Sequence, residues 1–436
     1  MGILSHRAAL AVFACALISA CAGPHERPSV ITDGEGFFGA PWPDDVRTNE
    51  GRPDLSDFPL RNTLSLIDDY ASRIEAIEGF GTNSPIFVPL DGPVDALPTP
   101  GETADTGGLV MLLDVDPNSP ERGSIIPVSL TQQTNDTKFQ RKDMLAVQPV
   151  WGFPLRPRTT YALIFSDEFI AASPAWRRGQ DWSNLEATLL ELRVDIDQVA
   201  HAVQFTTQDP VAELARAAAR IKADITVPPL DQELTPEQSR SDYDVFTGAM
   251  WLPMWQHGEK PYLIEGGGFV TDGEQMPELS GWERATFTVS VPSGTTMPDE
   301  GWPVVIYGHG TGGDHLSFVR RSTSISPAST LAEAGILGFG ISLPLHGDRA
   351  AGLDPALASF NYLNPDSARS CFRQGALDQI YLATLLSSAS HQFQTSSGIL
   401  KTDPTQVAYM GHSHGGLVGA MAAPFFGEGI KAVFLS

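Results

Sequence analysis

The chain has 436 residues, of which 42% are hydrophobic and 18% are charged, a composition typical of a folded protein with two or three domains. Its formal charge of −24 excludes the nucleic-acid-binding proteins, because their binding depends on Lys and Arg side chains that neutralise phosphates. The three cysteines, Cys15, Cys21 and Cys371, provide no disulfide framework, so a hydrophobic core has to stabilise the fold.

The first twenty residues are typical of an export signal. His6 and Arg7 precede an apolar stretch at residues 8–20, which is too short to span a bilayer. The end of this stretch, Leu-Ile-Ser-Ala-Cys, resembles the lipobox of bacterial lipoproteins. That resemblance implies cleavage before Cys21, a lipid on the Cys21 thiol and, because Ala22 follows, an anchor in the outer membrane. The alternative is an ordinary signal peptide of a periplasmic or secreted protein.

Residues 21–48 are polar and are predicted to form a tether, and residues 49–225 to form a β-rich domain with flanking helices. The segment from Pro154 to Tyr161 resembles the turn-to-strand signature of bacterial immunoglobulin-like modules, which implies a sandwich-like domain. Apolar spacing predicts helices at 63–77 and 182–200 and a third that begins after Asp209. Short apolar runs predict strands at 86–88, 109–113, 125–128, 144–147, 161–165 and 202–207.

After a predicted linker at residues 226–261, the pattern from 262 to 436 indicates an α/β domain. Residues 284–291 alternate between apolar and polar, which predicts a strand with one buried face. Four later runs are apolar throughout, which is typical of parallel strands buried on both faces, and helix-like stretches separate them. The apolar runs are 304–307, 336–343, 407–410 and 432–435, and the helical stretches are 329–334, 368–387 and 417–423.

The pentapeptide Gly411-His412-Ser413-His414-Gly415 has the G-x-S-x-G form of a nucleophile elbow. It lies between a predicted strand and a helix-compatible stretch, which is the setting that this motif requires. The two glycines allow the tight approach of helix and strand, and the turn projects the serine hydroxyl. The pattern therefore predicts that Ser413 is a nucleophile and that the N–H of His414 points at a developing oxyanion. The alternative is a glycine-rich turn with a solvent-facing serine.

A second glycine-rich loop, Gly308-His309-Gly310-Thr311-Gly312-Gly313, follows another buried strand. It resembles the His-Gly loop of lipases and esterases, which implies that the Thr311 N–H, or alternatively the Gly310 N–H, completes the oxyanion hole. The same glycines match the dinucleotide fingerprint G-x-G-x-x-G. That alternative requires a helix at the loop and an acidic residue after the next strand, and the sequence offers neither.

Together these motifs resemble the α/β-hydrolases, and the whole chain resembles exported bacterial lipases and esterases with an N-terminal β domain. The resemblance implies hydrolysis of a small-molecule or lipid ester through an acyl-enzyme, without a cofactor or a metal. Leu343-Pro344-Leu345-His346-Gly347-Asp348-Arg349 resembles the loop after the fourth strand of these enzymes. Gln374 and Asp378, on the predicted long helix, are interpreted as packing or hydrogen-bonding residues.

The acid and the base of a triad are not evident in the sequence. In the α/β-hydrolases both follow the serine, whereas here only His414 and Glu428 do. His412 and His414 adjoin Ser413 and extend in other directions, and Glu428 precedes a strand. The sequence therefore predicts a sheet that is incomplete at its C-terminal edge because the chain is truncated. The alternatives are a non-catalytic envelope lipoprotein that acts as a binding module, and an unconventional base.

Overall fold

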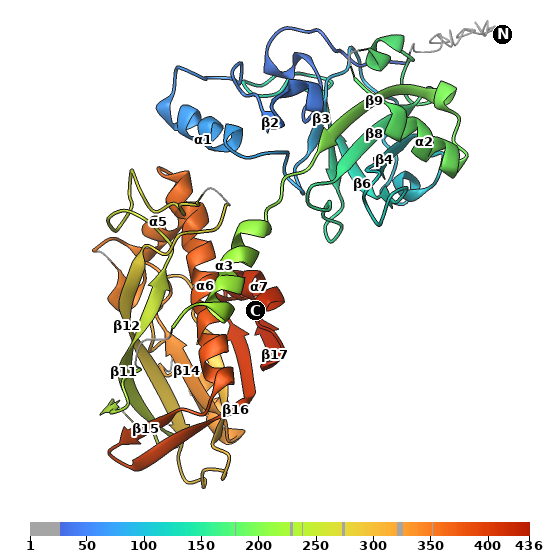
Figure 1. The fold of residues 1–436 in the computed structure, drawn as a ribbon. Coiled ribbons are helices and arrows are strands. Elements are labelled where there is room, and N and C mark those ends of the chain that lie inside the picture. Colours follow the sequence, from blue (N-terminus) through green and yellow to red (C-terminus); the bar gives the residue numbers. More distant parts are fainter. Residues whose placement is uncertain are drawn as a thin grey trace, which may run out of the picture. The chain divides into compact units, whose positions relative to one another are not determined.

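The computed structural model describes residues 27–178, 180–226, 230–237, 239–272, 275–320, 326–350 and 352–436. The described chain divides into two compact units, and many of their elements are labelled in Figure 1. The first unit extends to residue 46 and adds residues 83–155 and 159–205; the second contains residues 47–82, 156–158 and 206–436. The predicted export signal and Cys21 lie outside the described residues.

The first unit contains two small β-sheets. One has the order β3-β7-β6 and is antiparallel, and the other has the order β5-β4-β8-β9. A helix, α2 (Ser183–Leu192), packs Leu185 and Leu189 with Met111 and Ile164 of the second sheet. The strands are β3 (Ile86–Val88), β4 (Val110–Asp114), β5 (Ile125–Ile126), β6 (Val128–Gln132), β7 (Leu145–Pro149), β8 (Thr160–Ser166) and β9 (Val199–Thr206).

The second unit is built around an eight-stranded mixed sheet with the order β10-β11-β12-β14-β13-β16-β15, in which β17 also pairs with β16. Strands β14, β13, β16 and β17 are parallel, whereas β10, β11, β12 and β15 join the sheet through antiparallel pairs. The strands are β10 (Thr235–Pro236), β11 (Tyr243–Met254), β12 (Gly281–Pro292), β13 (Trp302–Gly308), β14 (Leu337–Ile341), β15 (Gln392–Thr395), β16 (Gly398–Gly411) and β17 (Ile430–Leu435). A separate hairpin pairs β1 (Thr48–Asn49) with β2 (Arg52–Pro53).

Helices cover both faces of this sheet, because the residues of its central strands alternate between two cores. Val304 and Ile306 of β13 pack in the main core with α3 and α6, whereas Tyr307, next to them in sequence, packs in a smaller core with α4. This burial on both faces explains the continuous apolar runs of the sequence. The helices are α1 (Ser65–Glu75), α3 (Ala212–Ala223), α4 (Pro327–Glu333), α5 (Pro355–Phe360), α6 (Pro365–Ser388) and α7 (His414–Ala422).

Three expectations about the organisation of the chain differ from the structure. The predicted linker at 226–261 contains the twelve-residue strand β11, which pairs along its whole length with β12. Helices α1 and α3, predicted within the N-terminal domain, belong to the second unit, since the apolar face of α3 packs in the main core there. The helix predicted at 182–200 ends at Leu192, where Arg193 has a left-handed backbone, and β9 begins at Val199.

Candidate active site

Ser413 occupies a sharp turn between the end of β16 at Gly411 and the start of α7 at His414. Its backbone has φ 51° and ψ −113°, a conformation that is unfavourable for any residue with a Cβ atom. The residue is exposed at the carboxyl end of a strand that lies in the parallel part of the sheet. The turn therefore holds a serine hydroxyl at the surface at a cost in backbone strain.

The glycines on either side of Ser413 are required by close backbone approaches. A Cβ atom at Gly415 would lie 2.1 Å from the carbonyl oxygen of Gly308 at the end of β13. A Cβ atom at Gly411 would lie 2.3 Å from the carbonyl oxygen of Gly415. Because real side chains do not approach backbone this closely, only glycine lets α7 start against β13 and β16.

The loop after β13 lies directly against this turn. A Cβ atom at Gly310 would be 3.3 Å from the Cβ of Ser413, so the loop backbone lies close to the serine and leaves no room for a side chain between them. The Thr311 hydroxyl is hydrogen-bonded to Nδ1 of His414 at 3.3 Å, and the His414 side chain is buried. Within the described part of the chain, the backbone N–H groups of Gly310, Thr311 and His414 donate no hydrogen bond. The structure thus brings together the three residues that the sequence associated with Ser413.

Three buried histidines, His309, His346 and His414, pack against one another next to the Ser413 turn. The sequence did not predict this cluster. The ring centroids of His309 and His346 are 5.1 Å apart, as are those of His346 and His414. Burial lowers the pKa of His309 to about 4, and burial together with the neighbouring imidazoles lowers the pKa of His414 to about 3. Burial also lowers the pKa of His346. All three imidazoles are therefore neutral near pH 7.

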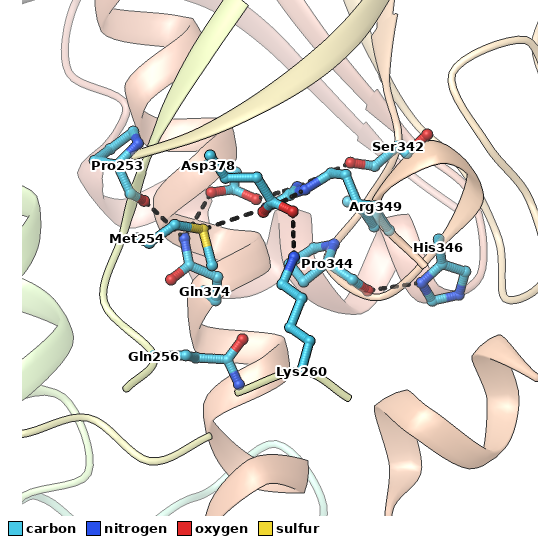
Figure 2. Close-up of polar contacts among 12 residues, drawn as sticks. Pro253, Met254, Gln256, Lys260, Ser342, Pro344, His346, Arg349, Gln374 and Asp378 are labelled. Carbon is cyan, nitrogen blue, oxygen red and sulfur yellow. Dashed lines mark hydrogen bonds and ion pairs between the residues drawn. The ribbon is translucent and has the colours of Figure 1, made fainter. Parts of the chain in front are cut away.

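The hydrogen bonds of the cluster fix the orientation of two rings. His309 donates from Nδ1 to the carbonyl oxygen of Gly310. Its Nε2 accepts a hydrogen bond of 2.8 Å from the N–H of Leu343, which follows β14. His346 donates from Nδ1 to the Pro344 carbonyl at 2.8 Å (Figure 2). The Nε2 atoms of His346 and His414 are buried and make no hydrogen bond among the described residues. The hydrogen bond between Leu343 and His309 therefore joins the loop after β14 to the loop after β13.

A buried ion pair anchors the loop that carries His346. Figure 2 shows Arg349 at the centre of this network. Its guanidinium contacts Asp378 of α6 at 2.6 Å, Glu283 of β12 at 2.9 Å and the Ser342 carbonyl at 2.9 Å. Gln374 donates to Asp378 at 2.7 Å, so Gln374 and Asp378 of α6 are both hydrogen-bonded in the interior, as expected from the sequence. The network fixes residues 342–349 against the sheet.

No general base is evident beside Ser413. Among the described residues, no imidazole or carboxylate is hydrogen-bonded to the Ser413 hydroxyl. Nδ1 of His412 is hydrogen-bonded to the Ser436 hydroxyl at 3.2 Å, and Nδ1 of His414 to that of Thr311. Glu428 lies before β17, as the sequence predicted. The arrangement therefore places an exposed serine hydroxyl beside the backbone N–H groups of Gly310, Thr311 and His414.

The dinucleotide alternative does not fit the loop after β13. Residues 311–319 are turns and irregular backbone, and no helix begins at the glycines, since α4 starts at Pro327. Strand β14 ends at Ile341 and is followed by Ser342 and Leu343 rather than by an acidic residue.

Within the described ranges, no group of three or more His, Cys, Asp or Glu side chains is arranged to hold a metal ion, and no helix is long and apolar enough to cross a membrane.

No family profile and no curated protein matches the chain. Solved structures with a partly similar fold include acetyl xylan esterases and other α/β-hydrolases. The esterase from Paenibacillus sp. R4 is 16% identical, with a TM-score of 0.31 over 52% of this chain and 60% of its own. That from Thermoanaerobacterium sp. is also 16% identical, with a TM-score of 0.31 over 51% and 57%. Brefeldin A esterase, a bacterial homologue of human hormone-sensitive lipase, is 18% identical, with a TM-score of 0.25 over 52% and 48%. The chain spans less than two thirds of each of these structures.

Proposed function

We propose that the chain is a carboxylic ester hydrolase of the α/β-hydrolase superfamily and that Ser413 is its nucleophile. The observation that carries this proposal is the strained, exposed conformation of Ser413 between β16 and α7, with the Gly310 backbone close to it. A non-glycine residue is held at an unfavourable φ only where the surrounding structure imposes it, and such positions cluster at functional sites. Strand, elbow and helix also occur in the order that the motif requires.

The proposed reaction proceeds through an acyl-enzyme. The Ser413 hydroxyl oxygen bonds to the ester carbonyl carbon, the carbon–oxygen bond to the alcohol breaks, and the alcohol leaves with the serine proton. Water then attacks the acyl carbon, and the acid and the free serine are regenerated. The N–H groups of His414 and Thr311, with that of Gly310 as the alternative to Thr311, are proposed to stabilise the oxyanion. No residue is assigned as the base that accepts the Ser413 proton.

The proposal is tested by the hydrolysis of p-nitrophenyl acetate. We expect turnover by the native chain to fall to the background rate in Ser413→Ala and to be unchanged in Ser129→Ala, a control at an exposed serine of β6. An unconventional base would raise the rate above the residual catalysis that an oxyanion hole and substrate binding give without a triad. Equal rates for the native chain and Ser413→Ala would contradict the proposal and favour the alternative, a non-catalytic binding protein.

We further propose that the protein is exported to the cell envelope through residues 1–20 and is anchored by a lipid on Cys21. The support is the sequence of the signal, since these residues lie outside the described structure. The substrate is proposed to be a small-molecule or lipid ester. Mass spectrometry of the mature N-terminus, compared with that of Cys21→Ser, distinguishes a lipid anchor from an ordinary signal peptide.

A further inference from the structure

An aromatic surface begins at the residue next to Ser413. The imidazole of His414 is stacked on the ring of Phe372 in α6, with centroids 4.5 Å apart and an interplanar angle of 9°. Phe360, at the end of α5, contacts both rings, with centroid distances of 5.4 Å to Phe372 and 5.8 Å to His414. His414 is buried, whereas Phe360 and Phe372 are only half-buried. Each phenyl ring therefore packs toward His414 and is partly open to solvent.

The apolar surface continues outward from Phe360. Leu357 in α5 is 66% exposed, and Tyr362 and Leu363 in the connection to α6 are 72% and 54% exposed. Burial of such side chains is favourable by about 25 cal/mol per Å² of apolar surface, so neighbouring exposed positions of this kind typically mark a binding surface. The location is specific, because this surface adjoins the turn that carries the proposed nucleophile.

We infer that Phe360 and Phe372, which pack on the buried ring of His414, form the subsite for an apolar acyl group that is longer than acetyl. This inference rests on the proposed function, since the acyl carbon has to bond to Ser413. An acyl chain bonded there lies one residue from His414, and a chain that extends over the half-buried phenyl rings removes their open surfaces from water.

The test measures how fast Ser413 reacts with two p-nitrophenyl phosphonates, one with an ethyl and one with an octyl group on phosphorus. In this reaction the serine oxygen bonds to phosphorus and p-nitrophenolate leaves. Intact-mass spectrometry gives the labelling rate. A fully buried methylene is worth about fourfold, so partial burial of the longer chain is expected to make octyl labelling about tenfold faster than ethyl labelling.

The variants Phe360→Ala and Phe372→Ala are expected to reduce this octyl-to-ethyl ratio toward one, and Phe372→Leu to keep most of it. Phe153→Ala, at an exposed phenylalanine of the first unit, is the matched control and is expected to leave the ratio unchanged. A purely structural role of the rings would slow both probes equally and leave the ratio of the native chain intact. Labelling with equal rates for both probes, or a ratio that survives in Phe360→Ala and Phe372→Ala, overturns the inference. Failure of both probes to label the native chain counts against the proposed nucleophile instead.

Discussion

The backbone strain at Ser413 makes a quantitative prediction about two substitutions that both remove the hydroxyl. At φ 51° and ψ −113°, a residue with a Cβ atom costs roughly 1–3 kcal/mol, and glycine adopts this conformation without that cost. Glycine also gains about 0.5–1 kcal/mol of conformational freedom in the unfolded chain, which opposes the gain. We therefore expect Ser413→Gly to be more stable than Ser413→Ala by about 1 kcal/mol, although both are inactive.

The assay is urea unfolding at 25 °C, followed by tryptophan fluorescence, with the midpoint compared between the two variants. Ser396 provides the matched control, because it is exposed in the turn between β15 and β16 and its φ is not positive. At this position we expect the variant Ser396→Gly to be less stable than Ser396→Ala. If Ser413→Gly is no more stable than Ser413→Ala, the serine is not held in a strained turn, and the structural argument for a nucleophile fails.

Three further predictions concern the surroundings of Ser413. Thr311→Val removes the hydrogen bond to His414 and should slow Ser413 phosphonylation about fivefold, whereas Thr311→Ser should restore it; equal rates would contradict a role in positioning. The depressed pKa values of His309 and His414 mean that the unfolded chain takes up protons first as pH falls below 6.5. The free energy of unfolding should therefore drop by about 2 kcal/mol per imidazole between pH 6.5 and 5, as measured by urea unfolding. A free energy of unfolding that does not change over this pH range would show that these rings are not buried. Arg349→Met leaves Asp378 buried without its partner and should lower the free energy of unfolding in urea by about 3–5 kcal/mol. The double variant Arg349→Met/Asp378→Leu should recover part of this loss, and no recovery would show that the broken ion pair is not its cause.

The local signals in the sequence were sufficient to predict the elbow. Ser413 and its flanking glycines are adjacent in sequence, and the steric reasons for those glycines are contacts with the ends of β13 and α7. The expected strands at 304–307 and 407–410 are confirmed as parts of β13 and β16, and the alternating residues 284–291 as part of β12. Periodicity predicts these strands well because burial on one or both faces determines their composition.

Features that depend on tertiary pairing were not predicted. Strand β11 contains Gly248 and Pro253 within its length, and its long antiparallel pairing with β12 stabilises it despite them. The histidine cluster forms because β14, β13 and β16 are neighbours in the sheet, which brings His346, His309 and His414 together from positions far apart in sequence. The recurring His-Gly pairs were the available signal, and only the strand order shows that they meet.

The most direct test of the central claim is the reaction of the native chain with a fluorophosphonate, followed by peptide mapping. We expect a single adduct, located on Ser413, which is absent in Ser413→Ala and in protein unfolded in urea before the reaction. An adduct on another residue, or no adduct on the folded chain, would contradict the assignment of Ser413 as the nucleophile.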